Sequence, residues 1–311
     1  MSDVSLVTGG AGFIGSHLID ALVAEGHRVR VLDDLSTGQA TNLPPGVEFV
    51  QGSVGDPAAV ASAMSGVRTV YHLAALASVQ RSVEAPADSH HVCATGTLHV
   101  LDAARRHGVK RVVYAASASA YGIPSGPVQR ETDPVLPLSP YAAAKLAGEV
   151  YCQAFAATYG LETVRLRFFN IFGPRQRSDS PYSGVIAIFA GMLAAGRTPT
   201  IFGDGQQTRD FTYVSDVVQA LRKAADTPGL RDEVFNVGTG QPTTLLDLIA
   251  GLNAILGKTI TPNHAEARVG DIRHSCANIE QTRARLGYAP QVAFAEGLRR
   301  TMEWASGAGS H

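Results

Sequence analysis

A run of glycines between two apolar segments of different periodicity constrains this chain more than any other feature. Residues 4–7 form a short apolar run typical of a buried strand, and residues 14–24 have the spacing of a helix. The glycines between them satisfy both GxxGxxG and GxGxxG, and are Gly9, Gly10, Gly12 and Gly15. Such a turn lets a diphosphate approach the backbone at a helix N-terminus. The segment therefore predicts a dinucleotide-binding site.

An acidic residue at the end of the next apolar run supports this prediction. Asp33 follows the run 28–32 and lies 18 residues after Gly15, close to the ~20 residues that are typical of dinucleotide-binding folds. A carboxylate at this position accepts hydrogen bonds from both adenosine ribose hydroxyls and repels a 2′-phosphate. We therefore expect the cofactor to be NAD rather than NADP.

The first half of the chain alternates short apolar runs with amphipathic segments. Further strands are expected at 47–50, 69–73, 111–115 and 163–168, and further helices at 97–107 and 141–159. This alternation predicts an α/β fold, with a doubly wound parallel sheet of the Rossmann type and helices on both faces.

The alternation ends near residue 170, where loops rich in Pro, Gly and Ser begin. Helices are expected near 184–195, 243–255 and 293–305, and short strands near 200–202, 234–237 and 259–262. We therefore expect an NAD-binding domain over residues 1–169, to which a segment at about 205–240 returns. Residues 170–311 would mainly form a smaller substrate-binding domain over the carboxyl edge of the sheet.

Composition excludes several other classes of protein. A net charge of −1 gives no field that would attract nucleic acid or an anionic membrane. Three distant cysteines provide neither a disulfide framework nor a metal site, and the longest uncharged stretches contain Ser, Pro and Gly. The strand pattern begins within three residues of Met1, which leaves no room for a signal peptide. We expect a cytoplasmic protein with no metal, nucleic-acid partner or membrane segment.

A tyrosine and a lysine at helical spacing are the candidate catalytic pair. Tyr141 and Lys145 lie at i and i+4, on one face of the helix expected at 141–159. A nearby ammonium favours the phenolate, so the pKa of Tyr141 is expected to fall from about 10 toward neutrality. Ser117 follows a central strand, where ligands bind in parallel sheets, and is the best candidate to hydrogen-bond the reacting oxygen. Ser119 is the second candidate.

Eight motifs occur in order along nearly the whole chain. They are TGGAGFIG at 8–15, DDLSTG at 33–38, HLAA at 72–75, SASAYG at 117–122, YAAAK at 141–145, RFFNIFGPRQ at 167–176, GDGQQTRDFTYVSD at 203–216 and RVGDIRHS at 268–275. Together they resemble an extended short-chain dehydrogenase/reductase of the NAD-dependent epimerase/dehydratase family. Within that family the chain is similar to the nucleotide-sugar 4-epimerases.

The resemblance implies a tightly held NAD, a UDP-sugar substrate and a transient 4-keto sugar. Tyr141 would take the proton of the 4-hydroxyl with Ser117 bridging, while Lys145 holds the nicotinamide ribose. A homodimer through the helices near 81–106 and 141–159 is also implied. The implied cofactor contacts are Gly9, Gly12, Phe13, Ile14, Gly15, Asp33, Asp34, Ser36, Thr37, Gly38, Ser53, Val54, Leu73, Ala74, Ala75, Ala77, Tyr141, Lys145 and Phe168.

The resemblance also implies the residues that hold the substrate. Asn170, Arg209 and Arg268 would bind the nucleotide diphosphate. Thr200 and Phe202 would bind the uracil, and Asp271 would bind a ribose hydroxyl. The other implied substrate contacts are Ser117, Ser119, Tyr141, Gly184, Val185 and Ser275. Ser275 stands where a bulky tyrosine would limit the sugar to UDP-glucose and UDP-galactose, so we expect N-acetylated sugars to be accepted as well.

Four positions depart from the family pattern. Ser53 stands where an aspartate usually contacts the adenine, and Cys93 stands where an asparagine is usual. Asp34 replaces a common asparagine and Val269 a common proline. None of these changes removes Ser117, Tyr141 or Lys145.

Alternative functions fit the sequence less well. Sibling dehydratases carry an Asp-Glu pair where this chain has Ala118 and Ser119, which cannot do acid–base work. A reductase that consumes NADPH is disfavoured by Asp33, and a decarboxylase is more distant. A UDP-glucuronate 4-epimerase, or another NAD-dependent enzyme that modifies UDP-sugars, remains open. A non-catalytic NAD-binding sensor would be expected to lack the catalytic side chains that this chain retains.

Overall fold

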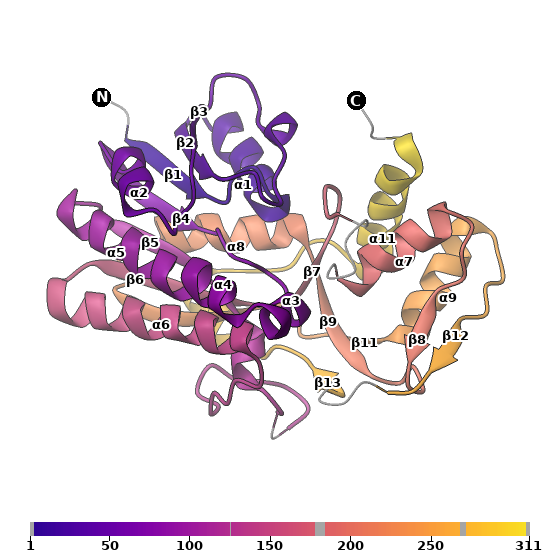
Figure 1. Cartoon of the computed structure of the whole chain (residues 1–311). Coiled ribbons are helices and arrows are strands. Elements are labelled where there is room, and N and C mark those ends of the chain that lie inside the picture. Colours follow the sequence, from indigo (N-terminus) through magenta and orange to yellow (C-terminus); the bar gives the residue numbers. More distant parts are fainter. Residues whose placement is uncertain (1–2, 125, 178–183, 268–271, 309–311) are drawn as a thin grey trace.

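The computed structural model describes residues 3–124, 126–177, 184–267 and 272–308. Its largest element is a seven-stranded sheet in the order β10-β6-β5-β4-β1-β2-β3, in which every neighbouring pair is parallel (Figure 1). The strands are β1 (Val4–Thr8), β2 (Arg28–Asp33), β3 (Glu48–Gln51), β4 (Val67–His72), β5 (Arg111–Ser117), β6 (Glu162–Phe168) and β10 (Asp232–Val237). The expected doubly wound sheet is confirmed, and the strand order reverses between β1 and β4.

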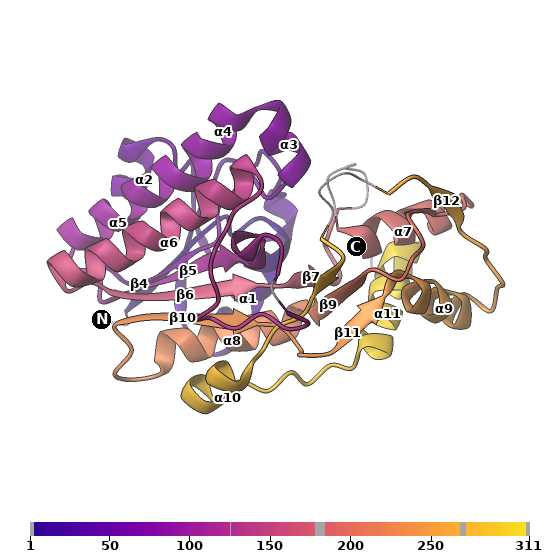
Figure 2. The ribbon, with the colours of Figure 1, turned by 90° about the horizontal axis from the view of Figure 1, so that it is seen from below.

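Helices cover both faces of this sheet because its strands are apolar on both sides. Leu6 and Val7, adjacent on β1, lie in two separate hydrophobic clusters. One face carries α1 (Phe13–Ala24), α8 (Val214–Asp226) and α10 (Glu280–Leu286), and the other carries α2 (Pro57–Ala63), α5 (Gly96–Arg106) and α6 (Pro140–Tyr159). Figure 2 shows α5 and α6 on one side of the sheet and α8 on the other. Shorter helical segments precede α5, namely α3 (Val79–Glu84), α4 (Pro86–His90) and a π-helix (His91–Thr95).

A smaller unit lies beside the carboxyl edge of the main sheet, on the right of Figure 1. In it, β9 (Thr208–Tyr213) pairs with three strands, β7 (Asn170–Phe172), β11 (Pro242–Thr244) and β13 (His274–Ser275). A separate pair consists of β8 (Thr200–Phe202) and β12 (Asn263–Ala265). The helices α7 (Val185–Ala194), α9 (Leu245–Leu256) and α11 (Phe294–Glu303) pack with β9 around a third core.

Two expected strands are placed differently in the structure. The strand expected at 259–262 is wrong, because Ile260 exchanges two hydrogen bonds with the Asn253 side chain near the end of α9 and the strand begins only at Asn263. The strand expected near 234–237 is part of β10, which joins the edge of the main sheet beside β6. No helix of the described part of the chain is long and apolar enough to cross a membrane.

A buried polar network joins β1, β4 and α5 beneath the point where the strand order reverses. His72 Nδ1 lies 2.7 Å from the Thr8 hydroxyl oxygen, and Nε2 lies 3.0 Å from that of Thr97. Thr97 donates its own proton to the Cys93 carbonyl, so it accepts from Nε2 and leaves Nδ1 to accept from Thr8. Burial lowers the pKa of His72 to about 3, and the imidazole is therefore neutral at physiological pH.

This network predicts a stability that falls in mild acid. An unfolded histidine takes up a proton near pH 6.5, whereas folded His72 takes one up only near pH 3. The unfolded state therefore binds more protons between these values, and stability rises with pH across the window. Between pH 7 and pH 5 the free energy of unfolding, measured with urea, should drop by about 2 kcal/mol through His72 alone. His72→Gln should remove that part of the pH dependence, and an unchanged slope in the variant would contradict the assignment.

Candidate active site

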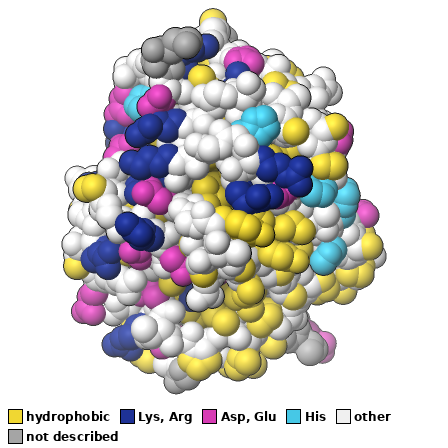
Figure 3. Space-filling model, turned by 90° about the vertical axis from the view of Figure 1, so that its left-hand side faces the viewer, with side chains coloured by type: hydrophobic (Ala, Val, Ile, Leu, Met, Phe, Trp, Pro, Cys, Tyr) yellow, Lys and Arg dark blue, Asp and Glu magenta, His cyan; other side chains and the backbone are white. Residues whose placement is uncertain are grey.

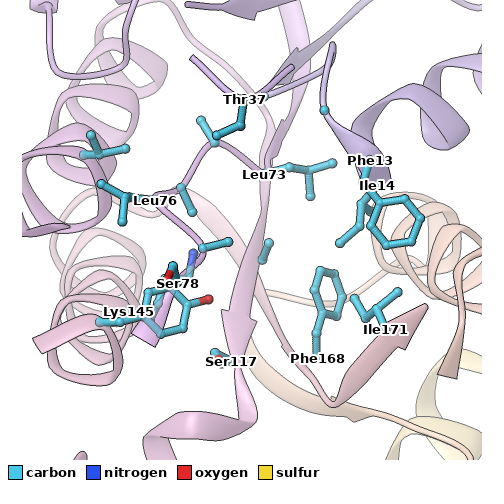
Figure 4. A pocket seen from close by; sticks show the side chains of 18 of the residues that line it. Phe13, Ile14, Thr37, Leu73, Leu76, Ser78, Ser117, Lys145, Phe168 and Ile171 are labelled. Atoms are coloured by element: carbon cyan, nitrogen blue, oxygen red, sulfur yellow. The ribbon is translucent and has the colours of Figure 1, made fainter. Parts of the chain in front are cut away.

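A cavity of about 1370 Å³ opens at the carboxyl ends of the central strands, between the main sheet and the smaller unit. Figure 4 shows part of its lining. Ser78 and Lys145 lie on one side, Phe13, Ile14, Phe168 and Ile171 on the other, and Ser117 below them. Parallel sheets bind ligands at this place, because the connections diverge where the strand order reverses.

The glycine turn forms a cradle that side chains would fill. Gly9 has a φ of +70°, and a Cβ on it would lie 2.8 Å from the backbone of Ala74. A Cβ on Gly15 would lie 2.3 Å from the carbonyl oxygen of Gly9. Among the described residues no side chain caps the N-terminus of α1 at Gly12, so the first-turn N–H groups can bind an anion. The turn fits a diphosphate.

Asp33 lies at the end of β2, next to this cradle. Its two carboxylate oxygens accept from the backbone N–H groups of Ala11, at 2.9 Å, and Leu35, at 2.8 Å. Burial raises its pKa, and these two hydrogen bonds oppose the shift. Each oxygen keeps acceptor capacity for a ribose hydroxyl, so the geometry fits the adenosine half of NAD.

The three candidate catalytic side chains come together where β5 meets α6. Ser117 ends β5, and its hydroxyl oxygen accepts from the N–H and from the hydroxyl of Ser119, at 3.2 and 2.8 Å. Tyr141 and Lys145 stand on the first turns of α6, which Ser139 caps by accepting from the Ala142 N–H. With its acceptor sites occupied by Ser119, Ser117 can donate its own proton to the Tyr141 phenol.

The expectation that Lys145 lowers the pKa of Tyr141 toward neutrality is wrong. Burial raises the pKa of Tyr141, and a hydrogen bond with Ser117 acts in the opposite direction. The ammonium of Lys145 instead lies over the ring of Tyr114, 4.4 Å from its centroid, and burial lowers the pKa of the lysine. Helical spacing placed the two side chains on one face of α6, but it did not show how deeply both are buried.

Residues of the smaller unit form the other end of the cavity. Asn170 on β7, Arg209 on β9 and Ser275 on β13 all line it, and so do Gly184 and Val185 at the start of α7. The strand register brings the first three together, because β9 pairs with both other strands: Asn170 faces Phe211, and Ser275 faces Arg209.

Most of the predicted site residues line this cavity. Besides those already placed there, they are Asp34, Ser36, Thr37, Ser53, Val54, Leu73, Ala74, Ala75, Ala77 and Ser119. Gly38 instead packs against the backbone of Ala11, and Thr200 and Phe202 lie on β8, outside the described wall of the cavity. Arg268 and Asp271 lie outside the described residues.

Sequence reasoning missed Gln176, which also lines the cavity. Its side-chain N–H₂ donates to the Ile171 carbonyl at 3.2 Å, while its buried Oε1 has no partner within the described part of the chain. A buried amide oxygen without a donor is costly, and a sugar hydroxyl or amide N–H would satisfy it. Gln176 is the last residue of the RFFNIFGPRQ motif, and its place in that motif was the one feature of the sequence that could have indicated a role at the site.

Comparison with known proteins agrees with this geometry. The family model described as NAD dependent epimerase/dehydratase family matches residues 5–238. A UDP-glucose 4-epimerase from Mycolicibacterium smegmatis is 43% identical over 96% of this chain and 97% of its own length. The chain belongs to the NAD-dependent epimerase/dehydratase family.

Two solved structures share the whole fold. A UDP-glucose 4-epimerase from Thermotoga maritima, with UDP-glucose, is 38% identical with a TM-score of 0.94, over 98% of this chain and 99% of that one. A UDP-N-acetylglucosamine 4-epimerase from Methanobrevibacter ruminantium M1, in complex with UDP-N-acetylmuramic acid, is 36% identical with a TM-score of 0.93, over 98% of both chains. The cofactor of the family is NAD, and the glycine cradle and Asp33 fit it.

Proposed function

We propose that this chain is a 4-epimerase of UDP-hexoses that works through a 4-keto intermediate. The observation that carries the proposal is the position of Ser117, Tyr141 and Lys145. They line one cavity whose opposite ends fit a dinucleotide and a nucleotide sugar. Asp33 marks the first end, and Arg209 marks the second with a guanidinium suited to a diphosphate.

In this proposal the chain's own residues bind the sugar and move a proton, and the hydride acceptor would be the bound cofactor. Tyr141 accepts the proton of the sugar 4-hydroxyl as general base, and later returns it. Ser117 donates to the reacting oxygens and holds them in line, since Ser119 fixes its orientation. Lys145 supplies a buried positive charge and hydrogen-bond donors for a ribose. Bound NAD supplies the hydride acceptor, together with a positive charge that favours the phenolate of the buried tyrosine.

The side chains after Ser117 argue against a dehydratase. Ala118 has no ionisable group, and the hydroxyl of Ser119 donates to Ser117 rather than standing ready as an acid. Removal of water across carbons 5 and 6 needs an acid and a base beside those carbons. The geometry therefore favours an enzyme that exchanges only the hydrogen at carbon 4.

Replacing Tyr141 with Phe tests the proton acceptor. The phenyl ring preserves the packing, so NAD content and UDP binding should stay within about twofold of the unaltered protein. Turnover should fall by about 10²–10⁴, the usual contribution of a general base. Tyr159→Phe at the far end of the same helix, which changes an exposed phenol that does not line the described cavity, is the matched control and should retain full activity. More than half of the original rate in Tyr141→Phe would show that another group is the base.

The sugar accepted depends, in this proposal, on Ser275. It is a small polar side chain, and it lines the cavity beside Arg209, its partner in the pairing of β13 with β9. A serine leaves space for an acetamido group and can hydrogen-bond it, whereas a tyrosine would fill that space. We infer that UDP-GlcNAc and UDP-GalNAc are interconverted at least as well as UDP-Glc and UDP-Gal.

Replacing Ser275 with Tyr should separate the two substrate pairs. Turnover of UDP-GlcNAc should drop by about tenfold or more, about 1.4 kcal/mol in the barrier, while that of UDP-Glc is spared. Ser275→Ala, which keeps the space, should act on both pairs. Equal losses on both pairs in Ser275→Tyr would contradict the role of this side chain, as would the absence of UDP-GlcNAc turnover in the unaltered protein. UDP-glucuronate, assayed in parallel, tests the uronic acid alternative.

We also propose that two copies of the chain associate through α3, α5 and α6. Val79 and Val83 on α3, and Val150 and Tyr151 on α6, are exposed although apolar or aromatic. Figure 3 shows hydrophobic side chains gathered in the lower half of one face, next to histidines and to side chains of Lys or Arg. Light scattering should give twice the chain mass of 32.6 kDa, and Val150→Arg should shift it toward one chain. A single-chain mass for the unaltered protein would contradict the dimer.

A further inference from the structure

Asp210 is a fully buried carboxylate next to the substrate end of the cavity. It stands on β9 directly after Arg209, but strand alternation turns it away from the cavity that Arg209 lines. Its Oδ1 accepts from the N–H and the hydroxyl of Thr239, at 2.8 and 2.6 Å. Its Oδ2 accepts from the N–H groups of Gly240, at 2.9 Å, and Ala277, at 3.1 Å.

These four hydrogen bonds connect three segments that are far apart in the sequence. Thr239 and Gly240 form the turn between β10 and β11, and Ala277 follows β13 by two residues. Gly238 leaves room for the carboxylate, because a Cβ there would lie 2.6 Å from Oδ2 of Asp210 and 2.6 Å from the Cβ of Ala277. Burial raises the pKa of Asp210, and the four donors oppose the shift.

The segment that Asp210 holds through Ala277 also carries Ser275. Ala277 lies two residues beyond it, and Ser275 itself pairs with Arg209 in the register of β13 and β9. A second anchor holds the same segment from the other side, because the Cys276 N–H donates to the Gln129 side chain at 2.9 Å. The strand pairing of β13 covers only His274 and Ser275, and a backbone bridge between Gln129 and Ala277 holds the residues that follow. Asp210 adds the side-chain contact that ties this segment to β9 and to the turn after β10.

We infer that Asp210 is a positioning residue that fixes Arg209 and Ser275 relative to each other at the substrate end of the cavity. The inference rests on the proposed function, since it concerns the fit of a UDP-sugar. Asp210 touches no substrate in this account. It acts through the backbone of three segments, and its loss should loosen the wall of the cavity that selects the sugar while leaving the NAD end intact.

The experiment compares Asp210→Asn with Asp216→Asn in the holoenzyme. Asp216 is a matched control, because it is also buried and its carboxylate also accepts two backbone N–H groups, those of Gln291 and Val292, at 2.9 and 3.2 Å. Asp216 is not among the residues that line the described cavity. Asparagine preserves the shape of each side chain but turns an N–H₂ toward donors that had an acceptor.

Asp210→Asn should weaken the binding of UDP, measured by calorimetry, by about tenfold, equivalent to about 1.4 kcal/mol. It should also change the ratio of UDP-GlcNAc to UDP-Glc turnover. Asp216→Asn should leave both the UDP affinity and this ratio unchanged. The NAD content of both variants should equal that of the unaltered protein. The buried thiol of Cys276, 4.0 Å from Oδ2 of Asp210, should react faster with iodoacetamide in Asp210→Asn alone.

If Asp210→Asn does not fold, Thr239→Val removes one donor and should show the same changes at a smaller size. Equal UDP affinity and sugar ratio in the Asp210 and Asp216 variants would overturn the inference. Failure of the unaltered holoenzyme to bind UDP would instead contradict the proposed function, and the inference with it.

Discussion

The close packing of α6 on β5 is the contact on which the catalytic geometry depends. Gly148 has no side chain where a Cβ would lie 2.2 Å from the Tyr114 hydroxyl oxygen, so the phenol reaches the backbone of α6. It donates there to the Lys145 carbonyl at 3.1 Å, and its ring lies beneath the Lys145 ammonium. One tyrosine therefore fixes both the height of α6 above the sheet and the position of the lysine. Tyr141 and Ser117 meet because these two elements are held at this distance.

The same packing explains the electrostatics of the site. Glu149, the residue four positions after Lys145, forms its ion pair with Arg167 at 2.8 Å, and its charge opposes the lowering of the lysine pKa by burial. An aromatic face stabilises a desolvated ammonium without neutralising it. The neutral His72 nearby adds no second positive charge. Burial lowers the pKa of Lys145 and raises that of Tyr141, so the same desolvation disfavours the charged form of both side chains.

The parts of the molecule that follow from local chemistry could be predicted from the sequence. The glycine turn and Asp33 lie within one stretch of about 25 residues, Tyr141 and Lys145 lie on one helix, and the alternation of segments indicates the doubly wound sheet. Contacts between distant segments could not be predicted. Asp210 and Ala277 meet only because β9 and β13 pair, and Tyr114 meets Gly148 only after α6 packs on β5. The direction of the Tyr141 pKa was predicted wrongly for the same reason, since burial is a property of the folded chain.

In the proposed reaction, hydrogen leaves carbon 4 as hydride and returns to the same carbon within a closed site. The most direct test of this transfer is the fate of deuterium at carbon 4 of UDP-N-acetylglucosamine, incubated with the holoenzyme in ordinary water and read by mass spectrometry and NMR. We predict a 4-epimer that keeps its deuterium at carbon 4, because the hydride does not exchange with solvent. A 4-epimer that has lost the label to water would show that carbon 4 is deprotonated instead, and would contradict the hydride transfer.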